Sequence, residues 1–253
     1  MSSLAIVIIT LACMLGGLLL GLYLRDVLPE HHTRDDSKDI VKTAAGMMAT
    51  LIALIVGLLV SSAKDSFDTT NANITQTGAK IITLDHFLSR YGSEAKGVRV
   101  HLRGSVASAV ERFWPNDSTQ HVDLTVLDTS TRMDEVYDEI RGLAPRNDSQ
   151  QYLKSQALQL GADVMQSRWL VVEQSQTGLP TIFLVVLTFW LTVLFAHFGL
   201  LAPRNPTAVL ALFVCAVSMS GAVFLILELN HPLEGAIKVS SAPLLKTLSI
   251  IGR

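Results

Sequence analysis

Residues 43–63 read TAAGMMATLIALIVGLLVSSA, a run without a single charged side chain. A helix needs about 20 predominantly apolar residues to cross a hydrocarbon core of about 30 Å, and in lipid its backbone groups must be paired internally. Three more uncharged windows occupy residues 1–24, 174–203 and 205–227. The sequence therefore predicts an all-α membrane protein with four transmembrane helices.

These windows divide the chain into four parts. Spans one and two fall in 1–62, an aqueous insert in 63–179, spans three and four in 180–229, and a C-terminal segment in 230–253. Proline is absent from 41–114, so we expect the second helix to run on beyond the membrane, with Gly78 and Gly92 as weak points. The insert is expected to be mainly helical, with further helices at Ser93–Phe113 (Ser93 as N-cap), Arg132–Leu143 and Ser149–Ser175.

A stripe of small residues runs along the second span. At helical spacing one face holds Thr43, Gly46, Thr50, Ala53, Gly57 and Ser61, and it continues past the membrane through Lys64 and Asp68. Small side chains and hydroxyls suit a pore wall, where bulky groups would block passage and oxygens can replace lost hydration. They suit close packing of helices equally well. These eight residues are therefore pore-lining candidates, with helix packing as the alternative.

Glycine and proline positions predict how the other spans are arranged. Gly17 and Gly21, one turn apart, allow a close helix approach, either inside the chain or between two copies. Pro180 suits the first turn of the third span. Between spans three and four, Asn205 can cap the fourth helix and Pro206 can take its first position, which predicts an antiparallel hairpin.

Composition and motifs exclude several classes of function. The net charge is −2 and no dense basic run occurs, so we expect no nucleic-acid partner. The sequence lacks GxSxG, HExxH, P-loop and dinucleotide-binding patterns, so no enzyme, catalytic residue or cofactor is predicted. His31 and His32 near Asp35 and Asp36 could bind a cation but also suit a solvated loop, and no metal site is predicted from them.

A family resemblance is carried mainly by residues 228–244, ELNHPLEGAIKVSSAPL. The pattern is acidic-x-x-x-Pro-apolar-x-Gly, a short β-prone run, and Ser-x-x-Pro-Leu; its fixed positions are Glu228, Pro232, Gly235, Ser240 and Pro243. It resembles the signature of bacterial bestrophin-like four-span proteins, long catalogued only as a domain of unknown function. The likeness covers nearly the whole chain, with further matching segments at GLLVSSAK (57–64), QSRWL (166–170) and FGLLAPRN (198–205).

The resemblance implies an oligomeric ion channel in the bilayer. Bestrophins are pentamers whose second helices line the pore and whose termini and insert face the cytoplasm. By resemblance we expect a homo-pentamer in the plasma (inner) membrane, an inorganic ion as the transported partner, and the small stripe as the pore wall. The alternative is a non-conducting scaffold or sensor whose helical insert binds a partner. The distribution of cationic residues mildly opposes a cytoplasmic insert. Near the spans, five lie on the outer face and three on the insert's face, whereas cytoplasmic loops usually carry the excess.

Two departures limit what the resemblance implies. The tryptophan pair that follows the bestrophin second helix is missing, and only Phe67 stands in that region. The dense acidic run of animal bestrophins is also missing, since Glu234 is the only acid after Glu228. Calcium gating and ion preference are therefore not implied. We expect the C-terminal segment to dock on the insert, with an extended run at 237–239 and a last helix from Pro243 that buries Leu244, Leu245, Leu248 and Ile251.

Overall fold

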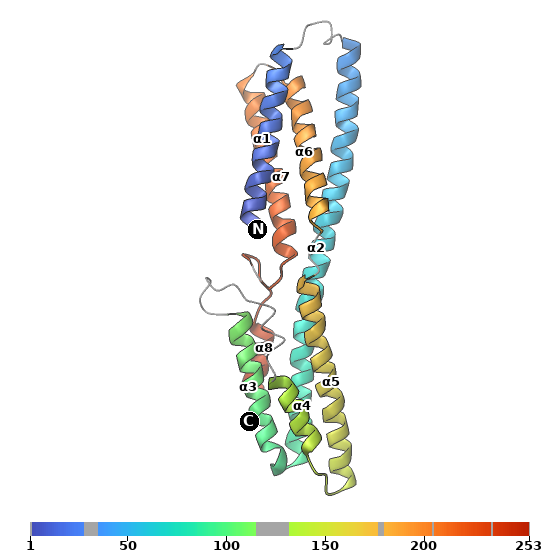
Figure 1. Ribbon diagram of the computed structural model, residues 1–253, viewed down its shortest axis with the longest axis vertical. Coiled ribbons are helices and arrows are strands. Elements are labelled where there is room, and N and C mark those ends of the chain that lie inside the picture. The colour runs from blue at the N-terminus through green and yellow to red at the C-terminus, as the bar shows by residue number, and fades with distance from the viewer. Residues whose placement is uncertain are drawn as a thin grey trace. The chain divides into compact units, whose positions relative to one another are not determined.

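The computed structural model describes residues 2–27, 35–114, 132–176, 180–203, 205–233 and 235–252 (Figure 1). The expected loop at 116–130 lies outside these ranges. The described elements are all helical, which confirms the all-α class. They are α1 (Ser3–Val27), α2 (Asp35–Tyr91), the 3₁₀ helix η2 (Ser93–Ala95), α3 (Lys96–Phe113), α4 (Arg132–Gly142), α5 (Asp148–Gln176), α6 (Thr181–Leu201), α7 (Pro206–Leu229) and α8 (Ala242–Ile250).

The four predicted spans correspond to α1, the first part of α2, α6 and α7. Among the described residues, these four helices are long and apolar enough to cross a membrane. The cap at the start of α7 is confirmed, since the Asn205 side chain accepts a hydrogen bond from the Thr207 N–H at 3.0 Å and Pro206 begins the helix. α6 begins at Thr181, so Pro180 is its N-cap and lies one residue before the first turn, the position predicted for it.

The chain forms two compact units. The first comprises Met1–Asp65 and Gly178–Asn230, and the second comprises Ser66–Thr177 and His231–Arg253. The first unit therefore holds α1, the apolar part of α2, α6 and α7, which are the elements suited to lipid. The second holds the rest of α2 with η2, α3, α4, α5 and α8.

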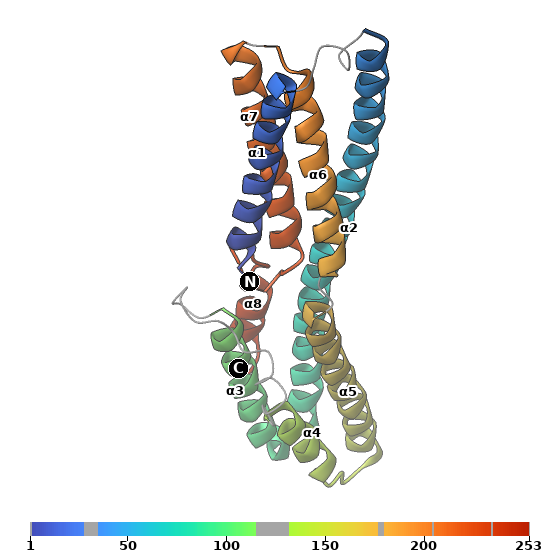
Figure 2. The same cartoon turned by 45° about the horizontal axis from the view of Figure 1, so that its top comes forward.

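In the first unit α1 packs against α6 and α7, as both views show (Figures 1 and 2). A Cβ atom at Gly17 or Gly21 would collide with the backbone carbonyl of Thr192 or Ala196. On the other side of this contact, a Cβ at Gly199 would collide with the Leu18 carbonyl. The small residues of α1 thus let two helix backbones touch inside the chain, which confirms intramolecular packing for this pair of glycines.

The second unit is an amphipathic helix assembly with its own core. The buried side chains come from the second half of α2, from α3, α4 and α5, and include Leu84, Leu88, Leu102, Val136, Ile140 and Ala157. α3 contacts α4 and α8, and α4 contacts α5. The second unit therefore has a hydrophobic core of its own, to which these helices contribute apolar side chains.

Two glycine predictions for α2 have different outcomes. The helix continues through Gly78, so the predicted weak point there is wrong; a Cβ at this position would lie 2.7 Å from the Thr247 hydroxyl oxygen, and the glycine instead makes room for α8. Gly92 does end α2, since its φ of 128° is disfavoured for other residues. Ser93 makes no capping hydrogen bond and begins a 3₁₀ turn, so its N-cap assignment is also wrong.

The C-terminal segment forms one backbone hydrogen bond within itself and one hydrogen bond with the side chain of Trp114, the residue that follows α3. The Val239 N–H donates to the Pro232 carbonyl at 2.9 Å, and the Trp114 indole N–H donates to the Val239 carbonyl at 2.7 Å. The segment is extended there without forming a strand in its described residues. Leu244 of α8 and Ile251 just after it are buried, as predicted. Leu245 is 50% exposed, so its predicted burial on the same face is wrong.

Candidate functional site

Within the first unit, α2 presents three distinct faces. The buried face holds Ala45, Ile52, Val56 and Ala63, which pack into the core of the unit. At 100° per residue, the small stripe lies about 120° around the helix from this buried face. A third face, about 90° further on, is apolar, bulky and exposed; it holds Ile40, Met47, Leu51, Leu54 and Leu58.

The small stripe is exposed, and its two glycines face open space. A Cβ added to Gly46 or Gly57 would find no heavy atom within 4 Å, unlike one added to Gly17 or Gly21 of α1. All eight of its positions are exposed, namely Thr43, Gly46, Thr50, Ala53, Gly57, Ser61, Lys64 and Asp68. The described helices of this chain therefore do not provide the packing partner that the alternative interpretation of the stripe requires.

The threonine hydroxyls on this face are held in a fixed orientation. Thr43 Oγ1 donates to the Asp39 carbonyl at 2.8 Å, and Thr50 Oγ1 donates to the Gly46 carbonyl at 3.0 Å. With its hydrogen committed to the helix, each hydroxyl retains acceptor capacity. The face thus combines small side chains with acceptor groups on an otherwise apolar span, so it could serve as a pore wall or as a contact with another copy.

The C-terminal signature is divided between the two units, with Glu228 in the first and the other four positions in the second. Glu228, the acidic position, is 4% exposed near the end of α7. Pro232 is buried, and Gly235 adopts a φ of 88°, the positive range that favours glycine. The Ser240 hydroxyl accepts a hydrogen bond from the Ala242 N–H at 3.2 Å, beside Pro243 in the first turn of α8. Gly235 thus allows a turn in the chain, and Ser240 and Pro243 mark the start of its last helix, roles that match their residue types.

The second unit contains a buried ion pair that also holds the end of the chain. The Asp85 carboxylate accepts hydrogen bonds from Arg99 at 2.8 and 2.9 Å and from the Gly252 N–H at 3.3 Å. The hydrogen bond to Asp85 raises the pKa of Arg99, although burial opposes the rise. Arg103 donates to the Ile251 carbonyl at 2.8 Å, so two residues tie down the last turn.

The remaining candidate groups are metal-ligand side chains and one buried tyrosine. Among the described residues, no three His, Cys, Asp or Glu side chains lie together as metal ligands would. His31 and His32 lie outside the described ranges. At the end of α2, burial raises the pKa of the Tyr91 hydroxyl; the Glu94 carboxylate adds to this effect and Arg146 opposes it.

Comparison with known proteins identifies the family. A family model described as a Bestrophin-like domain matches residues 12–244, which is most of the chain. The chain belongs to the bestrophin-like family. The resemblance read from the C-terminal signature is thereby confirmed, and the chain is a multi-pass membrane protein of that family. Among curated proteins, no significant match is found.

Solved structures share the bestrophin-like fold at low sequence identity. A tryptophan-to-alanine mutant of a bacterial bestrophin homologue from Klebsiella pneumoniae superposes with a TM-score of 0.69 at 14% identity, covering 99% of this chain and 97% of that one. An isoleucine-to-threonine mutant of the same homologue gives 0.65 at 13% identity, with 99% of both chains covered. A glycine-to-alanine mutant described as a membrane protein gives 0.64 at 15%, covering 100% of this chain and 96% of that one.

Sequence reasoning missed several residues that the structure brings into contact. Gly199 completes the α1–α6 contact, and its position in the third span could have indicated this. Trp114 holds the C-terminal segment, a long-range contact that no local pattern indicates. Arg112 and Arg168 face one cavity from α3 and α5, although they are far apart in the sequence.

Proposed function

We propose that this bestrophin-like chain forms a homo-oligomeric ion channel in which α2 lines the conducting path. The observation that carries the proposal is the exposure of the small face of α2 at all eight positions from Thr43 to Asp68. A span whose smallest side chains face away from its own bundle leaves room for an ion at a symmetry axis. Its hydroxyl oxygens can then replace part of the ion's hydration.

The other two faces of α2 suit a ring of copies. Its buried face holds the helix against its own bundle. Its bulky face, from Ile40 to Leu58, is apolar and exposed, so it can pack against lipid or against the neighbouring copy. Five copies are proposed by analogy with bestrophins, and an inorganic ion is the proposed transported partner. Membership of this family also favours transport over catalysis.

The proposed membrane is the plasma (inner) membrane, with both termini and the insert in the cytoplasm. Four spans return the chain to its starting side, which supports a shared side for these parts. In a background lacking Cys13 and Cys215, Tyr152→Cys on α5 should be protected from a membrane-impermeant thiol reagent in intact cells. Lys42→Cys, before the second span, should be labelled. The reverse labelling pattern would overturn the orientation.

Current through the purified protein tests the pore assignment. In planar bilayers, Gly57→Trp should strongly reduce conductance while the oligomer remains intact, because the new ring would project from the small face. Gly16→Trp on α1 is the matched control, since Gly16 is also an exposed glycine with no heavy atom within 4 Å of its Cβ position. The control should conduct like the original protein.

Two other results would change the conclusion. If Gly57→Trp breaks the oligomer and Gly16→Trp does not, the small face is a contact between copies rather than a pore wall. An intact oligomer that never conducts across a range of ions, pH values and voltages would refute the channel. The scaffold alternative would then gain support from the exposed apolar side chains of α5, where Tyr152, Trp169 and Leu170 are 61%, 57% and 47% exposed.

A further inference from the structure

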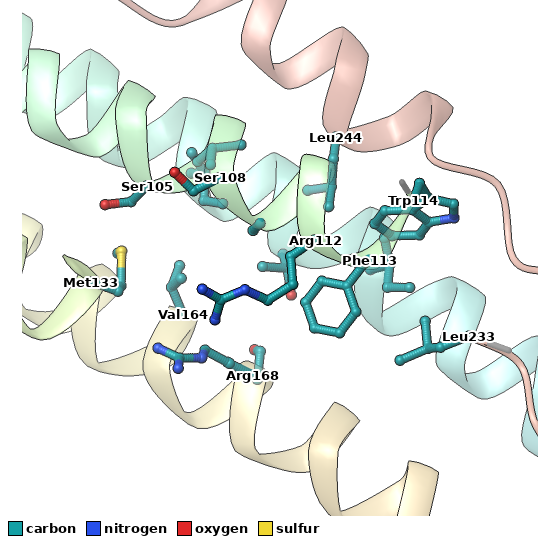
Figure 3. A pocket seen from close by; sticks show the side chains of 16 residues that line it. Ser105, Ser108, Arg112, Phe113, Trp114, Met133, Val164, Arg168, Leu233 and Leu244 are labelled. Atoms are coloured by element: carbon teal, nitrogen blue, oxygen red, sulfur yellow. The ribbon is translucent and has the colours of Figure 1, made fainter. Parts of the chain in front are cut away.

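A cavity of about 150 Å³ lies inside the second unit, bounded by residues of α2, α3 and α5 together with the C-terminal segment (Figure 3). Most of its surface is hydrocarbon, contributed by side chains such as Ile74, Val106, Val164, Leu233 and Leu244. Apolar cavities of about 150 Å³ can hold a molecule the size of benzene. The cavity is therefore large enough for one ring.

Positive charge collects around this apolar space. Arg112 from α3 and Arg168 from α5 are both half-buried, and their guanidinium groups point toward the side where Met133 and Val164 lie (Figure 3). A third cation stands close by, because Lys80 Nζ donates to the hydroxyl of Ser167, which also lines the cavity, at 3.1 Å. No acidic side chain occurs among the described lining residues. The charged side chains among the described lining residues are thus two arginines.

Two guanidinium groups at one cavity favour a planar anion. Each carries five N–H donors in a rigid fork that fits a carboxylate, and both residues also make other contacts in the structure. Partial burial lowers the effective dielectric constant around them and so strengthens attraction for a negative charge. The Ser108 hydroxyl in the lining already donates its hydrogen to the Gly104 carbonyl at 2.9 Å, so the two guanidinium groups are the donors for the anion.

The aromatic part of the lining is fixed in place. Phe113 and Trp114 pack with ring centroids 5.8 Å apart, tilted by 59°. The Trp114 indole is also held by its hydrogen bond to the Val239 carbonyl at 2.7 Å. Figure 3 shows these rings with Leu233 on the side away from the guanidinium groups. A ligand with one charged end and one apolar ring would match both parts of this lining.

We propose that this cavity binds a small organic anion, a carboxylate carried on a single aromatic or similarly sized apolar ring. Arg112 and Arg168 hold the carboxylate, and the apolar lining encloses the ring. The site lies wholly within the second unit, so the inference does not depend on whether the protein conducts ions.

Calorimetric titration of the purified full-length protein in detergent tests the site. Benzoate is the probe; benzyl alcohol tests the ring without the charge, and acetate tests the charge without the ring. Benzoate should bind saturably, and each comparison compound should bind about ten- to a hundredfold more weakly, as expected when charge-assisted hydrogen bonds or apolar burial are lost. Absence of saturable benzoate binding, or equal affinity for benzoate and benzyl alcohol, would overturn the proposal.

Variants assign the binding to this cavity. Arg112→Gln and Arg168→Gln should each weaken benzoate binding about tenfold or more and leave benzyl alcohol unaffected. Ala109→Leu, which adds bulk to the lining, should weaken both. Arg141→Gln, on the exposed side of α4, is the matched control and should bind benzoate normally. Unchanged benzoate affinity in folded arginine variants would show that the anion binds elsewhere. If those variants do not fold, unchanged affinity in Ala109→Leu would lead to the same rejection.

Discussion

Removal of one hydroxyl group is expected to stabilise the protein. Tyr91, the last residue of α2, is 3% exposed, and among the described residues no group forms a hydrogen bond with its buried hydroxyl. A buried polar group left unpaired costs about 1–3 kcal/mol. Tyr91→Phe keeps the ring and deletes the oxygen. We expect the free energy of unfolding to rise by about 1 kcal/mol, the lower end of that range, because a one-atom void remains.

Thermal unfolding of the full-length protein in detergent measures this effect. For a chain of 150–250 residues, 1 kcal/mol corresponds to a rise in Tm of about 2–4 °C. Tyr152→Phe is the matched control, because Tyr152 is 61% exposed and its hydroxyl reaches water in both states. It should leave Tm unchanged. A fall in Tm for Tyr91→Phe would refute the reasoning, since it would mean that the hydroxyl forms a favourable interaction.

The same substitution has a predictable dependence on pH. Burial raises the pKa of Tyr91, so the folded state holds the phenolic proton more tightly than the unfolded state does. The contribution of Tyr91 to stability is complete below the unfolded tyrosine pKa of about 10 and is lost as pH rises above it. Tyr91→Phe has no phenolic proton to lose, so the difference in Tm between this variant and the original protein should increase above about pH 10. A constant difference from neutral to alkaline pH would contradict the buried state of this hydroxyl.

Three other substitutions test the packing and capping contacts. Gly21→Leu should prevent α1 from packing on α6, whereas Gly16→Leu should be tolerated; the yield of monodisperse protein in size-exclusion chromatography compares them. Asp85→Ala leaves the partly buried Arg99 without this carboxylate and should destabilise the protein by about 3 kcal/mol, while the double variant Asp85→Leu with Arg99→Leu should recover most of the loss in thermal unfolding. Asn205→Ala removes the α7 cap and should cost about 1 kcal/mol, whereas Asn205→Asp should retain most of the stability.

The sequence predicted those features that depend on local pattern. Charge-free windows identified the spans because the bilayer imposes a length and an internal pairing of the backbone. Asn205 and Pro206 identified a helix start because their roles depend on a single turn of chain. The small stripe of α2 could also be recognised in the sequence, because its residues recur at helical spacing.

Features that depend on distant contacts were not predictable from the sequence. Gly78 looked like a weak point because a helical glycine lacks side-chain contacts, but its space is filled by Thr247, far along the chain. Leu245 follows the helical spacing and is nevertheless exposed, because contacts with α2 and α3 decide which side of α8 is covered. The cavity between Arg112 and Arg168 likewise required knowledge of how α3 and α5 face each other.

The close contact between α1 and α6 has a consequence for biosynthesis. Gly17 and Gly21 are made early, but their partners around Thr192 and Ala196 emerge only about 175 residues later. At about 5–20 residues per second, that interval is on the order of 9–35 s. During this time α1 displays a small-residue face in the bilayer with no native partner. The same face of a neighbouring nascent chain fits it, so premature pairing of two first helices is the competing reaction that the insertion machinery must outpace.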